Sequence, residues 1–213
     1  FNDGTFTWND ALAVTKNALY QCLTHDYSLW KTKIKGAQNA YDSYFLSNPY
    51  DYRAKDKETI YGYNGRSNIW QAYGLPTNDG VSQAGICPSQ ELVDAYNMAA
   101  TGEMPITGYS DEQHLTPIIN SASGYDATNP YEGRDPRFYA SIYYNGAVRF
   151  LNRPHGRKVE TYEGGAEQID RNGTSIKNTT TGYYLRKFNH YASTKTTNSD
   201  GWVRTFRLAD LYF

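Results

Sequence analysis

Residues 134–151 read RDPRFYASIYYNGAVRFL and contain several structural signals in one short segment. Asp135-Pro136 combines a favourable N-cap with a proline suited to the first position of a helix, which predicts one short turn. Residues 138–144 then alternate in the way that is typical of a strand. Asn145-Gly146 favours a type I′ hairpin turn, with a returning strand behind it. The segment therefore predicts a capped turn that leads into a β-hairpin.

Helices are predicted on both sides of this segment. Thr7 and Asp10 have the spacing of a capping box, and the periodic residues behind them predict a helix from Trp8 to Leu23. In CPSQELVDAYNMAATG (residues 87–102), Ser89 is a candidate N-cap and the closing glycine suits the position after a last turn. The final stretch, VRTFRLADLYF (residues 203–213), also has helical spacing and no terminating residue. We therefore expect the chain to be part of a larger protein.

The rest of the sequence predicts short strands and long loops. Glu58 to Tyr63 has strand composition, Asn64-Gly65 is a turn dipeptide, and the remainder to Gly85 is expected to be loop. Residues 103–130 and 152–181 are rich in loop-forming residues, and GYYLRKF (residues 182–188) is a short strand candidate. The predicted fold is mainly α with long loops and a few short β-strands or hairpins, in a single segment that spans residues 1–213.

Composition argues against several functional classes. Lys and Arg total 21, Asp and Glu total 22, and the net charge is −1, which does not favour nucleic acid as a partner. The four histidines lack metal-site spacing, and neither a P-loop nor a nucleophile elbow occurs, so we predict no metal, cofactor or catalytic residue. Carboxylates for glycoside cleavage could come from Glu160, Glu163, Glu167 and Asp170, but any acidic loop offers as much. Cys22 and Cys87 could be two thiols or one long-range disulfide.

Three stretches together resemble the SusD/RagB family of outer-membrane, nutrient-binding lipoproteins of Gram-negative gut and oral bacteria. They are CPSQELVDAYNM, RDPRFYASIYYNG and GYYLRKF with RTFRLADLYF, which cover about residues 86–213. The resemblance implies the loop-rich half of a tetratricopeptide-type α scaffold. It also implies a lipid anchor outside this segment, a location at the outer-membrane surface, and a SusC-like TonB-dependent transporter as partner. In these three stretches, Ser89, Asp135, Arg137, Arg207 and Asp210 are expected to serve the scaffold.

The function implied by the resemblance is non-catalytic capture of glycan for delivery to the transporter. Sugar binding requires aromatic platforms beside amide and guanidinium groups, and the 61–85 loop contains both kinds of side chain. The residues predicted to contact ligand are Tyr61, Tyr63, Asn64, Arg66, Asn68, Trp70, Tyr73 and Asn78. Alternatively, Trp70 and Tyr73 anchor the loop in a core. A second candidate stretch is NPYDYRA, with Tyr50, Tyr52 and Arg53. The alternative functions are peptide capture, as in the RagB branch, and glycoside hydrolysis.

Overall fold

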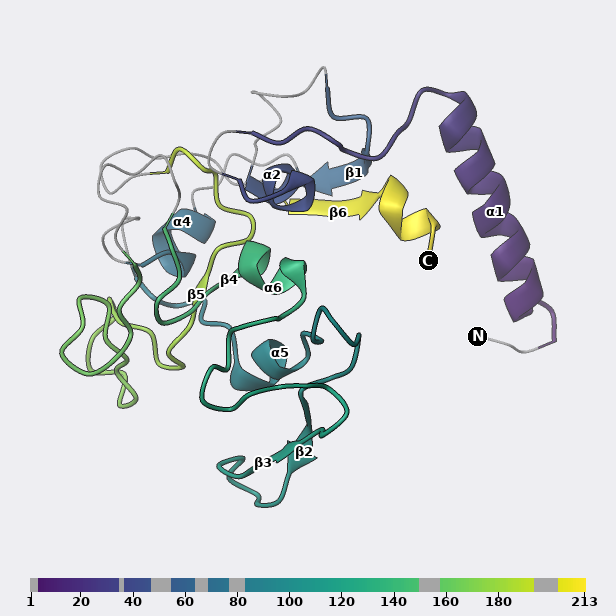
Figure 1. Ribbon diagram of the computed structural model, residues 1–213. Coiled ribbons are helices and arrows are strands. Elements are labelled where there is room, and N and C mark those ends of the chain that lie inside the picture. Colours follow the sequence, from purple (N-terminus) through teal and green to yellow (C-terminus); the bar gives the residue numbers. More distant parts are fainter. Residues whose placement is uncertain are drawn as a thin grey trace.

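The computed structural model describes residues 4–34, 37–46, 55–63, 69–76, 83–149, 158–193 and 203–213 (Figure 1). Its helices are α1 (Trp8–Thr24), α2 (Ala40–Leu46), α4 (Ile69–Gly74), α5 (Gln90–Asp94), α6 (Pro136–Ser141) and the 3₁₀ helix η1 (Leu208–Leu211). Its strands are β1 (Thr59–Tyr63), β2 (Ile106–Tyr109), β3 (Pro117–Ile119), β4 (Ile142–Tyr143), β5 (Tyr184–Leu185) and β6 (Val203–Arg207). The predicted long loops and short strands are confirmed. The described part is nevertheless poor in helix, and the tetratricopeptide-type scaffold stays a prediction.

The described strands form three two-stranded antiparallel ribbons, β1–β6, β2–β3 and β4–β5. In the first ribbon, Tyr61 lies opposite Phe206. In the third, Tyr143 lies opposite Tyr184. The first and third ribbons join strands that are far apart in the sequence. Long-range pairing therefore ties the C-terminal part of the described chain to its middle.

Helix α1 stands apart from the other elements (Figure 1). The predicted capping box at its start is confirmed, because the hydroxyl of Thr7 accepts a hydrogen bond from the N–H of Asp10, and the Asp10 carboxylate accepts one from the Thr7 N–H at 2.8 Å. None of the residues of α1 is buried, and its main contact is with η1. Along the described ranges, no helix is both long enough and apolar enough to cross a membrane.

Among the described residues, the larger of two apolar cores surrounds α2. Tyr44, Phe45 and Leu46 of this helix are buried in one cluster with Tyr143 and Tyr184 of the β4–β5 ribbon. The smaller core lies around α5 and α6 and consists of Val93, Phe138, Ile142 and Tyr183. The segment that follows β4 contacts both cores. Burial of apolar surface is the dominant stabilising contribution in such clusters.

A buried ion pair links α2 to the chain that follows β5. Arg186 donates hydrogen bonds to both carboxylate oxygens of Asp42, one of them at 2.9 Å, and another to the carbonyl of Ala140 in α6 at 3.2 Å. Both charged side chains are almost completely buried. Buried charges are tolerated when they are paired and hydrogen-bonded. This contact therefore fixes three segments relative to one another.

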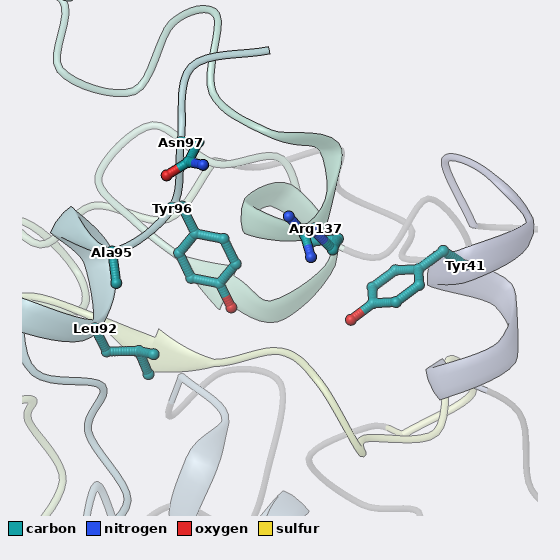
Figure 2. Close-up of a pocket in the computed structure, with 6 residues that line it drawn as sticks. All are labelled: Tyr41, Leu92, Ala95, Tyr96, Asn97 and Arg137. Carbon is teal, nitrogen blue, oxygen red and sulfur yellow. The ribbon is translucent and has the colours of Figure 1, made fainter. Parts of the chain in front are cut away.

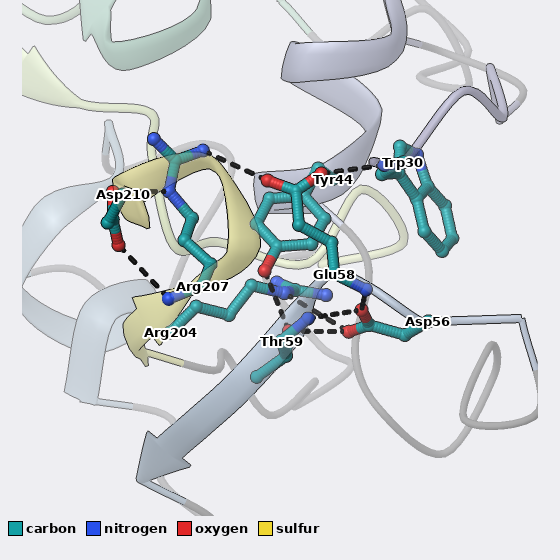
Figure 3. A network of polar contacts seen from close by, with 8 residues as sticks. All are labelled: Trp30, Tyr44, Asp56, Glu58, Thr59, Arg204, Arg207 and Asp210. Carbon is teal, nitrogen blue, oxygen red and sulfur yellow. Dashed lines mark hydrogen bonds and ion pairs between the residues drawn. The ribbon is translucent and has the colours of Figure 1, made fainter. Parts of the chain in front are cut away.

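A second polar network holds the β1–β6 ribbon against α2 (Figure 3). The hydroxyl groups of Tyr44 and Thr59 are 2.7 Å apart. The guanidinium of Arg204 lies 4.1 Å from the centroid of the Tyr44 ring, and Arg207 contacts Glu58 at 3.4 Å. Two arginines of β6 thus contact the core helix and the residues at the start of β1.

The predicted first strand of the 138–150 hairpin is wrong. The cap is confirmed, since Asp135 accepts a hydrogen bond from the N–H of Arg137 at 2.8 Å and Pro136 begins α6. However, the helix continues to Ser141 and leaves only two residues for β4. Phe138 and its neighbours Ala140 and Ser141 are all buried. Because both faces of this short segment lie inside the protein, alternation does not distinguish strand from helix.

A turn forms at Asn145-Gly146, but it is not the predicted type I′ turn, because φ is positive (+87°) at Gly146 and not at Asn145. The strand paired with β4 is β5. After the turn the chain meets residues 158–159 instead. The N–H of Gly146 donates to the carbonyl of Val159 at 2.8 Å, and the N–H of Val159 donates to the carbonyl of Ala147 at 2.9 Å. Phe150, which is expected in the returning strand, lies outside the described residues.

Helix α5 begins at the predicted N-cap, Ser89, but ends at Asp94, well before the predicted end. The guanidinium of Arg134 donates hydrogen bonds to the carbonyl of Val93 and, at 2.9 Å, to that of Tyr96. A longer helix would need these acceptors for its own N–H groups. The side chain of Arg134 therefore caps the end of α5 at Val93 and also holds Tyr96, two residues beyond the helix.

Three other expectations need correction. Residues 69–74 form α4 within the predicted loop, and residues 103–130 include the β2–β3 ribbon. The final stretch is β6 followed by η1, because Val203–Arg207 pairs with β1 and this tertiary contact overrides the helical spacing. The expected pairing of Arg207 with Asp210 is confirmed at 3.2 Å. Cys22 and Cys87 are free, half-buried thiols, so they form no disulfide.

Candidate functional site

A pocket of about 320 Å³ opens between α2, α5 and α6 (Figure 2). In Figure 2 the hydroxyl groups of Tyr41 and Tyr96 point toward one another, and the guanidinium of Arg137 lies between them. The described residues that line it are Tyr41, Leu92, Ala95, Tyr96, Asn97 and Arg137. It combines aromatic rings with an amide and a guanidinium, the groups that the sequence predicts for a single loop. Here they come from three separate segments.

A structural element positions each aromatic ring of the pocket. Tyr41 lies in the first turn of α2, and its ring packs edge-on against Phe45 with 4.8 Å between centroids. Tyr96 follows α5, and its ring packs edge-on against Phe138 of α6 at 5.6 Å. Edge-to-face contacts of this kind stabilise a defined ring orientation. The two platforms are thus held from behind by core residues.

The RDPR segment, residues 134–137, joins the remaining sides of the pocket. Arg134 binds the carbonyl of Tyr96, and the N–H of Asp135 donates to the carbonyl of Asn97 at 2.8 Å. The same segment starts α6 and so presents Arg137 to the pocket. Its scaffold role, predicted from the sequence, is confirmed for the cap formed by Asp135. In addition, it fixes the residues that line the pocket.

Arg137 supplies the only formal charge in the described lining of this pocket. Its Nε and Nη2 donate to the two carboxylate oxygens of Asp135 at 2.9 and 2.6 Å. These hydrogen bonds raise the pKa of Arg137 and lower that of Asp135, so both remain charged at neutral pH. In the described ranges no group accepts a hydrogen bond from Nη1. One edge of the guanidinium is therefore open to a ligand.

The two phenol hydroxyl groups of the pocket are also available to hydrogen-bond a ligand. Within the described part of the chain, neither the Tyr41 hydroxyl nor the Tyr96 hydroxyl has a protein partner. Burial raises the pKa of Tyr41, and the nearby phenol of Tyr96 adds to this effect, so the hydroxyl remains protonated at neutral pH. The side-chain N–H of Asn97 donates to the carbonyl of Gly102 at 2.9 Å. The site can therefore stack against a ring and hydrogen-bond its substituents.

A second pocket of about 310 Å³ adjoins the first and shares Tyr41 and Arg137 with it. It extends along η1 and the start of β1. Its other lining residues are Leu29, Trp30, Ala40, Tyr44, Glu58, Arg207, Ala209 and Phe213. Tyr41 and Arg137 thus line both pockets.

The structure separates the residues that the sequence predicts for ligand contact. Tyr61 lies on β1 and is 67% exposed, opposite Phe206, which is also exposed. Trp70 and Tyr73 lie on α4, which Figure 1 shows well away from β1. Trp70 is half-buried, and its ring lies 5.3 Å from that of Phe188. Of this set, the exposed aromatic residues in the described ranges are Tyr61 and Tyr73, and they occupy different elements.

The side chains of the other residues predicted to contact ligand are not among those that the structure describes. Tyr63 contributes its backbone to β1. The remaining members of the set, Asn64, Arg66, Asn68 and Asn78, lie outside the described residues, as do Tyr50, Tyr52 and Arg53 of the second candidate stretch.

Glu167 and Asp170, two of the four acidic residues considered for catalysis, have structural contacts. Glu167 is completely buried and forms an ion pair with Arg149. Asp170 accepts hydrogen bonds from the N–H of Ser175 at 2.6 Å and from the hydroxyl of Thr174 at 2.8 Å, which orders its own loop. Among the residues that the structure describes, no group of three or more His, Cys, Asp or Glu side chains could hold a metal ion.

Sequence reasoning misses the pocket because its residues are scattered. Tyr41 belongs to a stretch without clear periodicity, Tyr96 fits the apolar stripe of a helix, and Arg137 fits a cap. A usable signal is nevertheless present: Tyr96-Asn97 and Arg137 fall within two of the three stretches that together carry the family resemblance. Residues that pack two motifs together also shape the space between them.

Comparisons with known proteins identify the relatives of this chain. A family model described as the SusD family matches residues 19–213. A SusD-like protein from Bacteroides fragilis has a similar solved structure, with 23% identity and a TM-score of 0.55; the match covers 99% of this chain and 42% of that one. A SusD-like carbohydrate-binding protein from the same organism matches with 19% identity and a TM-score of 0.59, over 95% of this chain and 36% of that one. The chain thus spans less than half of either structure. The comparison with curated proteins finds no match.

Proposed function

The chain belongs to the SusD family, and on that premise we propose that it captures glycan at the bacterial outer-membrane surface without cleaving it. The family match over residues 19–213 is the observation that carries this proposal. One of its structural relatives is a SusD-like carbohydrate-binding protein, which supports the same ligand class. Delivery to a SusC-like TonB-dependent transporter, and a lipid anchor outside this segment, complete the proposed role.

We place the glycan in the pocket formed by Tyr41, Tyr96, Asn97 and Arg137. A sugar ring presents an apolar face that can stack on a phenol, while its hydroxyl groups need donors and acceptors at the edge. Two platforms and a few hydrogen bonds of about 1 kcal/mol each give binding in the millimolar to micromolar range. Such an affinity suits a protein that must later release its ligand. The described lining contains no carboxylate, histidine or cysteine that could serve catalysis.

The exposed aromatic residues of the 61–85 region form the alternative site. Tyr61 offers an open ring face on β1, whereas Trp70 partly packs against Phe188. A substitution at Tyr61 is therefore the better test of ligand contact in this region. A change at Trp70 would alter packing as well as any ligand contact.

A glycan-array screen of the intact protein, with a peptide pool as control, tests the function. We expect one class of oligosaccharide to bind, with affinity lowered at least about tenfold by Tyr96→Ala. Because the ring of Tyr96 also packs against Phe138, the unfolding midpoint of this variant is measured beside its affinity. Tyr162→Ala removes an exposed ring from another loop and should leave binding unchanged. Loss of binding in Tyr61→Ala alone would move the site to β1. Binding of peptides but no glycan, or hydrolysis of the bound oligosaccharide, would refute the proposed function.

A further inference from the structure

The described lining of the pocket between α2, α5 and α6 carries charge of one sign only. Its described lining holds one positive charge, that of Arg137, and no carboxylate. Asp135 neutralises this charge from outside the pocket and occupies the edge of the guanidinium that carries Nε. The edge that carries Nη1 has no acceptor among the described residues. A free guanidinium edge presents parallel N–H groups whose spacing matches the two oxygens of a carboxylate.

Further positive charge lies behind Tyr41. The ammonium of Lys187 and the guanidinium of Arg207 are each 6.0 Å from the centroid of the Tyr41 ring. Arg207 is compensated by ion pairs with Glu58 and Asp210. Lys187 forms no ion pair with any carboxylate in the described part of the chain. Its charge therefore adds to that of Arg137 at this end of the pocket.

We propose that the pocket binds an acidic sugar unit, with the carboxylate of a hexuronate against the free edge of Arg137 and the sugar ring against Tyr41 or Tyr96. This inference rests on the proposed function and narrows its ligand to glycans that contain uronic acid. The hydroxyl oxygens of a neutral sugar also accept hydrogen bonds from the guanidinium, but hydrogen bonds to a charged acceptor are stronger. A planar carboxylate satisfies two N–H groups at once.

The test is a titration of the intact protein with hexuronate-containing oligosaccharides, each beside its carboxyl-reduced, neutral counterpart and beside a sulfated neutral oligosaccharide. We expect the carboxylate form to bind about tenfold more tightly than the reduced form, or better, and the preference to shrink as salt is raised. Arg137→Gln should remove the preference. Arg171→Gln, which changes an exposed arginine in the 158–181 loop, should keep it.

The outcomes separate this inference from the proposed function. Equal affinity for the carboxylate and reduced forms would overturn the acidic-sugar assignment while leaving glycan capture intact. Tighter binding of the sulfated oligosaccharide would overturn the carboxylate assignment. A preference that survives Arg137→Gln, in a variant with the unfolding midpoint of the parent protein, would overturn the assignment to this pocket. If no glycan binds at all, the proposed function itself fails.

Discussion

Among single residues, Lys187 has an unusual environment. Its ammonium lies 4.1 Å from the centroid of the Phe45 ring and 5.0 Å from that of Phe188. Burial lowers its pKa to about 8, with further lowering by the charges of Arg207 and Arg137 that Asp210 partly offsets. The contact with aromatic faces therefore does not fully replace the lost hydration.

The lowered pKa predicts a specific pH dependence of stability. The folded-state pKa lies below the ordinary value of 10.5, so the charged form destabilises the fold below about pH 8, and this cost disappears as pH rises toward 10.5. We expect Lys187→Met, which keeps the apolar stem, to raise the free energy of unfolding at pH 7 by about 1–3 kcal/mol. Urea unfolding at pH 7 and pH 10 measures the difference. A variant that is less stable than the parent protein at pH 7 would contradict this account of Lys187. A variant whose free energy of unfolding differs from that of the parent by the same amount at pH 7 and pH 10 would contradict it as well.

At the level of elements, Arg134 links α5 to α6. Only 2% of its surface is exposed, and its guanidinium binds the carbonyls of Val93, Tyr96 and Pro130. It also lies 5.2 Å from the centroid of the Phe138 ring. A single side chain thus ends one helix and packs on the next.

Replacing Arg134 should therefore disturb both helices. We expect Arg134→Met to lower the free energy of unfolding by about 2–4 kcal/mol, because buried carbonyls lose their donors. Arg137→Gln, which breaks an exposed ion pair in the same segment, should change it by less than about 1 kcal/mol. Urea denaturation of both variants is the measurement. Similar losses in the two would show that Arg134 has no special role in ending α5.

The elements that the sequence predicts best are those defined by local chemistry. The cap of α1 at Thr7, that of α5 at Ser89 and that of α6 at Asp135 are all confirmed. The errors arise where a distant residue takes part: β6 is a strand because β1 pairs with it, and the carbonyl of Val93 at the end of α5 accepts a hydrogen bond from Arg134. Contacts across long sequence separations leave no trace in local periodicity.

For the whole molecule, the same limit applies to the candidate site. Its chemistry, aromatic rings beside an amide and a guanidinium, could be predicted from the sequence. Its location could not, because Tyr41, Tyr96 and Arg137 meet only after α2 packs against α6 and Arg134 fixes the end of α5. The predicted loop supplies similar residue types, but Tyr61 lies on β1 whereas Trp70 and Tyr73 lie on α4. The sequence states the type of each residue, whereas the fold determines which side chains meet in one pocket.

The C-terminal segment, residues 203–213, closes the fold from a distance. β6 is the partner of β1, and its residues Arg204 and Arg207 neutralise Asp56 and Glu58. Glu58 is 5% exposed, so its charge depends on this pairing. The segment is therefore expected to be needed for cooperative folding, in contrast to the exposed residues at its end.

Ending the chain after residue 202 tests this directly. Without β6, the strand β1 loses its hydrogen-bonding partner and two largely buried carboxylates lose their arginines, which should abolish cooperative unfolding and the near-ultraviolet circular dichroism of the core aromatics. A chain of residues 1–211 differs from one of residues 1–213 by the exposed Tyr212 and Phe213, and both signals should persist in it. Thermal unfolding followed by circular dichroism distinguishes the two truncations. If the chain that ends at residue 202 unfolds with the midpoint of the parent protein, the α2 core is stable alone and the β1–β6 ribbon does not contribute to its stability.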